Sequence, residues 1–169
     1  TREYFRIHGR EEDYKELKPG NGALYDRLIE VDLSLVKPMI ALPFHPSNTY
    51  TVREFIDNAP DILREIEKET AAMSGSLKFR LTDKVIDGNV HVDQAIIAGC
   101  AGGTYENILQ AASILEGKST GAGDFSLSVY PQSQPVYFAL NNTSAINVLM
   151  NSGAVIKTAF CGPCFGAGD

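Results

Sequence analysis

The side chains best suited to chemistry in this sequence are three thiols, Cys100, Cys161 and Cys164. Cys161 and Cys164 form a Cys-x-x-Cys pair in the stretch "AFCGPCFGAGD", whereas Cys100 lies far earlier in the chain. Glycines flank all three, and glycine lets the backbone approach a bulky object and point amide N–H groups at it. The pattern is therefore compatible with a bound group at the cysteines.

Thiols in this arrangement are compatible with several kinds of site. A structural zinc ion takes four protein ligands, so it would need a histidine, and the nearest one, His91, is expected at the wrong end of its strand. A thioredoxin-like dithiol at Cys161 and Cys164 would leave Cys100 without a role. An iron–sulfur cluster held by three thiolates leaves one iron without a protein ligand, and that iron could act as a Lewis acid. Three small buried hydrophobic cysteines are also compatible with the spacing, which leaves these alternatives open.

The other polar candidates carry less chemistry. His8, His45 and His91 each lack an acidic partner at a spacing that would orient the ring, so they are expected to be surface or hydrogen-bonded side chains. Ser133 lacks a base that could activate it and is expected to cap a helix.

The elements that must position the thiols alternate between strands and helices. "QAIIAGC", "FSLSVYP" and "AVIKTAF" predict three short buried strands, the first ending at Cys100 and the third at Cys161. Between them, "TYENILQAASILEG", "SQPVYFAL" and "SAINVLMNSG" predict helices, with Thr104 as the cap of the first. This order predicts an α/β fold in which three layers, α/β/α, surround a mainly parallel sheet. Ligands in such folds gather beyond the carboxyl ends of the strands, where all three thiols would meet.

The first half of the chain is less regular. Residues 1–23 are polar and are expected to be a connecting segment with one short strand near Tyr4–Ile7, followed by a partial domain over residues 24–169. Alternation through Ile29, Val31 and Leu33 predicts another strand. Residues 51–73 have helical spacing broken by Asn58-Ala59-Pro60, which predicts two helical pieces. The Asp87-Gly88 pair between β-prone runs predicts a hairpin.

Composition narrows the function classes. The formal net charge is −6 and no two Lys or Arg residues are adjacent, which argues against nucleic acid or an anionic membrane as a partner. No apolar run is long enough to cross a bilayer. Three cysteines make a poor disulfide framework and indicate a reducing compartment, so a cytoplasmic location is expected.

Several motifs resemble the aconitase superfamily of hydro-lyases. They are "IAGCAGGTYENILQAASILEGK", "YPQSQPVYFAL" and "GAVIKTAFCGPCFG". The family typically has Gly-Ser-Cys-Thr-Asn before a helix with paired alanines, then a Pro-Gly-Ser turn, then a close cysteine pair followed by glycine. Upstream, "YDRLIEVDLSLVKPMIALPFHPSN" is similar to a family segment that ends in a Gly-Pro-Phe-Thr-Pro turn.

The resemblance implies a cofactor and a reaction. It implies that Cys100, Cys161 and Cys164 ligate a 4Fe-4S cluster whose unligated iron binds the hydroxyl and carboxylate of the substrate. The implied reaction is dehydration and rehydration of a small hydroxy carboxylic acid, with a separate base taking the α proton. The alternative is a non-catalytic domain with a zinc site or a dithiol at the same place.

The sequence also departs from the family pattern. Gly99, Ala101 and Gly102 replace the serine, threonine and asparagine around the first ligand, which puts the usual substrates in doubt. By the resemblance, the family's arginines follow the close cysteine pair, beyond Asp169, while its histidine, aspartate and serine groups come from other domains. The chain is therefore expected to be one domain of a larger enzyme, with no catalytic residue of its own, inactive alone, and dependent on the remaining domains as partners.

Overall fold

The computed structural model describes residues 1–73 and 79–168, whose contacts divide the chain into two units, Thr1–Pro38 and Met39–Asp169. The division predicted after residue 23 stays a prediction. The first unit contains helix α1 (Arg2–Ile7) and two 3-10 turns, η1 (Glu11–Asp13) and η2 (Leu33–Leu35).

The strand predicted near Tyr4–Ile7 is wrong, because these residues belong to α1. Glu3 lies in the first turn of this helix, and the Nε atom of Arg6 donates to its carboxylate at 2.7 Å. An ion pair three residues apart connects successive turns of a helix and has no equivalent in a strand.

The strand predicted through Ile29, Val31 and Leu33 is also wrong. Ile29 is 83% exposed, and the segment ends in η2, where the Asp32 carboxylate accepts from the Ser34 amide at 2.9 Å. A strand needs a second strand to satisfy its backbone groups, and alternation supplies an apolar face without supplying that partner.

The second unit begins with two hairpins and a helix. Strand β1 (Met39–Ala41) pairs antiparallel with β2 (Thr49–Thr51), and β3 (Val85–Ile86) pairs with β4 (Asn89–Val90) across the predicted Asp87-Gly88 turn. Between the hairpins, α2 (Val52–Met73) is kinked at Asn58, two residues before Pro60. Proline has no amide hydrogen and clashes with the preceding turn, so the predicted break in the helix is confirmed.

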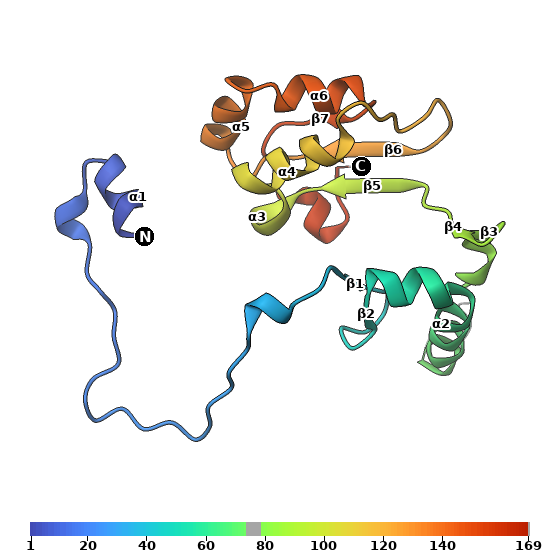
Figure 1. The fold of residues 1–169 in the computed structure, drawn as a ribbon, viewed down its shortest axis with the longest axis horizontal. Coiled ribbons are helices and arrows are strands. Elements are labelled where there is room, and N and C mark those ends of the chain that lie inside the picture. The colour runs from blue at the N-terminus through green and yellow to red at the C-terminus, as the bar shows by residue number, and fades with distance from the viewer. Residues whose placement is uncertain (74–78, 169) are drawn as a thin grey trace. The chain divides into compact units, whose positions relative to one another are not determined.

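The remaining residues form the predicted α/β arrangement (Figure 1). Strands β5 (Gln94–Ile97), β6 (Ser126–Val129) and β7 (Val155–Ile156) form a parallel sheet in that order. The first crossover contains α3 (Gly99–Gly102) and α4 (Tyr105–Leu115), and the second contains α5 (Gln134–Asn141) and α6 (Ala145–Asn151). The α/β class with a mainly parallel sheet, predicted from the sequence, is confirmed.

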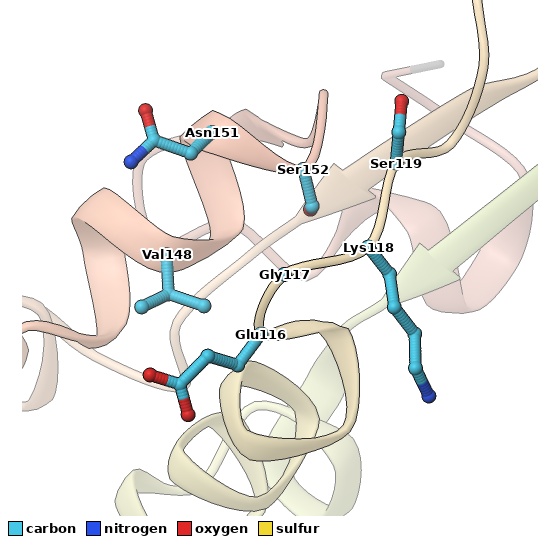
Figure 2. Close-up of a pocket in the computed structure, with 7 residues that line it drawn as sticks. All are labelled: Glu116, Gly117, Lys118, Ser119, Val148, Asn151 and Ser152. Atoms are coloured by element: carbon cyan, nitrogen blue, oxygen red, sulfur yellow. The ribbon is translucent and has the colours of Figure 1, made fainter.

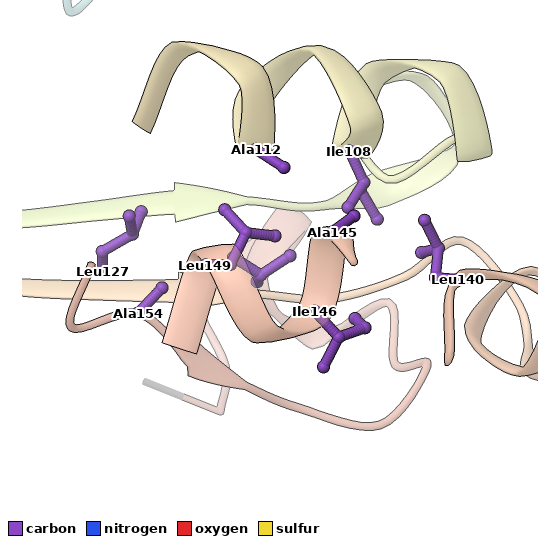
Figure 3. Packing of buried hydrophobic residues seen from close by; sticks show 9 residues of the cluster. Ile108, Ala112, Leu127, Leu140, Ala145, Ile146, Leu149 and Ala154 are labelled. Atoms are coloured by element: carbon purple, nitrogen blue, oxygen red, sulfur yellow. The ribbon is translucent and has the colours of Figure 1, made fainter. Parts of the chain in front are cut away.

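The core lies between one face of this sheet and the helices (Figure 3). Leu127 and Val129 of β6 pack with Ile108 of α4 and Leu149 of α6, all of them buried. Right-handed crossovers that step the same way across a sheet place their helices on the same face, which explains why α4 and α6 share this core. On the other face, the register aligns Ile96, Ser128 and Val155.

The third strand is shorter than predicted. It was expected to reach Cys161, but β7 ends at Ile156, after which the Lys157 amide donates to the Val129 carbonyl at 2.9 Å. The central strand ends at Val129, and Pro131 has no amide hydrogen to continue the ladder. The residues before Cys161 are therefore free to turn across the end of the sheet. Among the described residues, no helix has both the length and the apolar character needed to cross a membrane.

Candidate metal centre at the carboxyl edge of the sheet

The three thiols follow the carboxyl ends of the two outer strands. Cys100 comes shortly after β5, while Cys161 and Cys164 come after β7, and β6 lies between these strands. The Sγ atom of Cys164 lies 2.9 Å from the position that a β-carbon would take at Gly99, the residue before Cys100. All three cysteines are free and exposed. The structure thus brings the predicted site residues to one edge of the sheet.

The Cys100 loop, which we define as the short helix α3 and the residue after it (residues 99–103), is held by backbone and side-chain hydrogen bonds. Gly99 opens this loop at a φ of +81°, a value that L-residues with a side chain rarely adopt. The Gly103 amide donates to the Gly99 carbonyl at 2.9 Å, and the Asn107 side chain donates to the Ala101 carbonyl at 2.5 Å. Asn107 belongs to α4, whose first turn is capped by Thr104 as predicted. The helix therefore fixes the backbone on the carboxyl side of Cys100.

The loop that carries the other two thiols is the 3-10 turn η4 (Gly162–Phe165). The Cys164 amide donates to the Cys161 carbonyl at 3.3 Å, and the Ala167 amide donates to the Gly162 carbonyl at 2.9 Å. These bonds close the turn on itself, so the two thiols of the Cys-x-x-Cys pair are held as neighbours.

The predicted use of the glycines is only partly met. A β-carbon at Gly99 would meet a thiol sulfur, but one at Gly103 would lie 2.5 Å from the Tyr130 carbonyl oxygen, and one at Gly162 would meet the ring of Phe160. Gly103 and Gly162 thus make room for the protein's own chain. Only Gly99 among these three faces a candidate ligand.

A cavity of about 200 Å³ opens between the first two thiols. Its lining contains no charged side chain among the described residues and consists of Gly99, Cys100, Pro131, Gln132, Ala159, Phe160 and Cys161. A site of this kind can hold a group whose charge the thiolates balance, but it supplies no carboxylate or imidazole for proton transfer.

The thiols influence one another electrostatically. Desolvation raises the pKa of the Cys164 thiol, and the neighbouring Cys161 and Cys100 thiols raise it further. Adjacent thiolates repel each other unless a positive charge lies between them, and a metal centre provides such a charge. The donor set is therefore one that metal binding would convert to thiolates.

Among residues 1–73 and 79–168, no three His, Cys, Asp or Glu side chains converge on a single metal position. A mononuclear zinc site needs its ligands around one ion. A cluster has a different requirement, because each thiolate of an iron–sulfur site binds a different iron.

The remaining polar candidates have local roles. The Nδ1 atom of His8 lies 2.8 Å from the Tyr4 carbonyl, and that of His45 accepts from the Ser47 amide at 3.1 Å. The Ser133 hydroxyl accepts from the Val136 amide at 3.4 Å, as expected of a helix cap.

A larger cavity of about 480 Å³ lies away from the thiols (Figure 2). It is lined by residues 116–119 after α4 and by Val148, Asn151 and Ser152 of α6 and its end. These segments lead into β6 and β7, so the cavity belongs to the amino edge of the sheet, where both helices present carboxyl ends. Their partial negative charge disfavours an anionic ligand, and Figure 2 shows the Lys118 side chain extending away from Val148.

Comparison with known families shows to which family the chain belongs. The family model described as "Aconitase family (aconitate hydratase)" matches residues 1–169. The chain belongs to the aconitase family. It is 30% identical to the 3-isopropylmalate dehydratase large subunit of Acetivibrio thermocellus over 166 residues, which cover 98% of this chain and 32% of the relative. It is 31% identical to the 3-isopropylmalate dehydratase large subunit of Clostridium botulinum, again over 98% of this chain and 32% of the relative. The chain thus spans about one third of the length of these relatives.

Two residues of the candidate site, Tyr130 and Phe160, were not predicted from the sequence. Phe160 lines the cavity and packs against Gly162, and the Tyr130 hydroxyl donates to the Gly168 carbonyl at 3.1 Å. The available signal was the position of Tyr130, an aromatic residue between the end of the central strand and Pro131.

Proposed function

We propose that this aconitase-family chain supplies Cys100, Cys161 and Cys164 as the thiolate ligands of a 4Fe-4S cluster in a hydro-lyase. The observation that carries the proposal is the approach of Cys164 to Gly99 at the end of a different strand, which joins the two cysteine loops. The open cavity beside Cys100 and Cys161 supports it as well.

The cluster would supply a Lewis-acidic iron without a protein ligand. The chain's own residues do three things toward this. The sheet sets the distance between the two cysteine loops, Asn107 and η4 fix the backbone beside each thiol, and the uncharged walls of the cavity leave the thiolates as the local negative charge. Proton transfer would then depend on groups outside this cavity, which we assign to other domains or subunits of the parent enzyme.

The substrate that we propose is a small hydroxy carboxylic acid. The relatives are named 3-isopropylmalate dehydratase large subunit, which supports a dehydration reaction and an enzyme of more than one subunit. The family resemblance leads one to expect two hydroxyls and an amide near the first ligand, but these positions hold Gly99, Ala101 and Gly102. We therefore propose the substrate class and not the individual acid.

Anaerobic reconstitution with iron and sulfide tests the ligand set. The wild-type chain should take up about four irons per protein and develop the absorption of thiolate-bound iron. Serine at any one of the three cysteines should lower cluster uptake severalfold. Ala101→Ser adds a hydroxyl in the same loop without changing a thiol and serves as the matched control. The proposal would be refuted if neither this wild-type chain nor the larger enzyme to which we assign it bound iron.

A dithiol site is the second candidate. The Cys161 thiol is one of the neighbours that raise the pKa of the Cys164 thiol, as expected of a close pair that could form a disulfide. This function uses two thiols, so Cys100→Ser should leave disulfide exchange unchanged. If Cys100→Ser abolishes iron uptake while the wild type exchanges disulfides poorly, the cluster function is favoured.

A further inference from the structure

Tyr130 lies between the two cysteine loops. It directly follows β6, the central strand, and is only 4% exposed although it ends at the carboxyl edge of the sheet. Its amide donates to the Ile97 carbonyl of β5 at 2.8 Å, which fixes the backbone of the residue in the sheet. The tyrosine ring is therefore anchored at the point from which both loops depart.

The side chain of Tyr130 contacts the loop of Cys161 and Cys164. Its hydroxyl donates to the carbonyl of Gly168, 3.1 Å away, four residues after Cys164. Gly168 has a φ of +101°, and a β-carbon there would lie 3.1 Å from Phe160 and 3.5 Å from the Tyr130 hydroxyl oxygen. After η4, the chain thus folds back over Phe160, and Gly168 reaches the hydroxyl of Tyr130.

The backbone at Tyr130 contacts the loop of Cys100. Its carbonyl oxygen lies so close to Gly103 that a β-carbon there would be 2.5 Å away. Two residues later, the Gln132 amide donates to the Gly103 carbonyl at 2.7 Å. One segment of the central strand's end therefore holds both loops, the first through its backbone and the second through a phenol.

We propose that Tyr130 is a positioning residue that holds the Cys161–Cys164 loop against Cys100 through its hydrogen bond to Gly168. The consequence for a cluster rests on the function proposed above. The positioning itself does not, because it concerns the distance between thiols in the metal-free chain. The hydroxyl acts through the loop and touches no reacting atom.

Tyr130→Phe tests this with the smallest change, because it removes the hydroxyl and keeps the ring. In the metal-free chain of 169 residues, hydrogen exchange of the Ala167 amide should become about fivefold faster, the effect of one ordinary hydrogen bond. A short bifunctional thiol reagent should join Cys100 to Cys164 severalfold less efficiently. Tyr137→Phe makes the same change in a half-buried tyrosine that packs on the core and should alter neither quantity.

A second variant approaches the same contact from the other side. Gly168→Ala should loosen the loop as Tyr130→Phe does, because alanine disfavours the left-handed φ and meets Phe160. Gly123→Ala, at an ordinary φ with open space around it, is its control. Thermal unfolding of all four variants separates a local change from general loss of structure.

The cluster-dependent readout is the rate at which reconstituted protein loses its iron–sulfur absorption in air, which should rise about fivefold in Tyr130→Phe. If exchange and cross-linking change as expected while even the wild type binds no iron, the positioning role stands and the cluster function fails. The opposite result is that the wild type binds iron, while Tyr130→Phe and Gly168→Ala both show the same amide exchange and thiol cross-linking as the wild type. That result would overturn the positioning role and leave the cluster function standing.

Discussion

The sulfur of Cys164 and the backbone of Gly99 lie in contact across the end of the parallel sheet, with 2.9 Å between the Sγ atom and the β-carbon position of Gly99. Gly99 belongs to the crossover that leaves β5, whereas Cys164 belongs to the segment that follows β7, the last strand of the sheet. Their contact makes the spacing of the thiols depend on the whole sheet. It also makes Gly99 a residue that no larger side chain can replace at the same geometry.

Gly99→Ala should displace Cys164 and reduce cluster uptake severalfold. The new β-carbon would overlap the sulfur, and the φ of +81° at this position costs a residue with a side chain about 1–2 kcal/mol. Iron and sulfide content after anaerobic reconstitution, with thermal unfolding of the metal-free protein, measures both effects. Gly102→Ala, in the same loop with open space around it, is the control. Equal iron content in the two variants would contradict the expectation.

The reactivity of the Cys164 thiol should depend on pH in a way that reflects the neighbouring thiols. Because desolvation and the adjacent thiols raise its pKa, this thiol stays protonated to higher pH than an ordinary cysteine, and its alkylation should lag at neutral pH. The folded state favours the protonated thiol, so this contribution to stability is present at low pH and is lost as pH rises through the raised pKa.

Cys161→Ser should lower the pKa of Cys164 part of the way back, because it removes the thiolate whose charge opposes ionisation. Rates of Cys164 alkylation across a pH series, followed by mass spectrometry of the modified peptide, give the measurement. An unchanged pH profile in Cys161→Ser would show that the two thiols do not interact.

The cap of α4 should contribute measurably to stability. The Thr104 hydroxyl accepts from the Asn107 amide at 3.3 Å, so Thr104→Ala should lower the free energy of unfolding by about 1 kcal/mol. Ser144 stands at the same place before α6 without a side-chain capping bond, and Ser144→Ala should have a much smaller effect. Urea unfolding of both variants measures the difference, and equal losses would remove capping as the cause.

Packing on α4 should depend on which face a residue occupies. Ile108 is fully buried between the helices and the sheet, so Ile108→Ala should cost about 2–5 kcal/mol. Ile114 of the same helix is 63% exposed, and Ile114→Ala should change stability by about 0.5 kcal/mol or less. Denaturant midpoints compare the two, and a similar loss at both positions would place the core elsewhere.

The sequence was sufficient where local signals and tertiary packing agree. The apolar run before Gly99, the cap at Thr104 and the helical spacing through Ile108 correspond to β5 and α4, and the glycine-rich turns marked where the thiols leave the sheet. Pro60 marked the break in α2 for a local reason, the missing amide hydrogen.

Long-range partners could not be predicted in the same way. Ile29 alternates like a strand residue without a pairing strand, and β7 stops early because Pro131, on its neighbour, has no hydrogen to donate. The bond from Tyr130 to Gly168 joins residues far apart in sequence, and nothing in either local stretch indicates it. The gathering of thiols was predictable from strand order, whereas the contacts that hold them were not.

The strand order β5-β6-β7 also determines when in folding the three thiols can meet. Cys100 is synthesised well before Cys161 and Cys164, and it meets them only after β6 and then β7 have joined the sheet. A group that needs all three thiols can therefore enter only a chain whose two crossovers have already folded. Once inserted, it ties the first strand to the third, so opening the sheet would also require releasing the group. Insertion of the bound group would thus be the last step in the formation of the folded chain, and release of the group would be the first step in its unfolding.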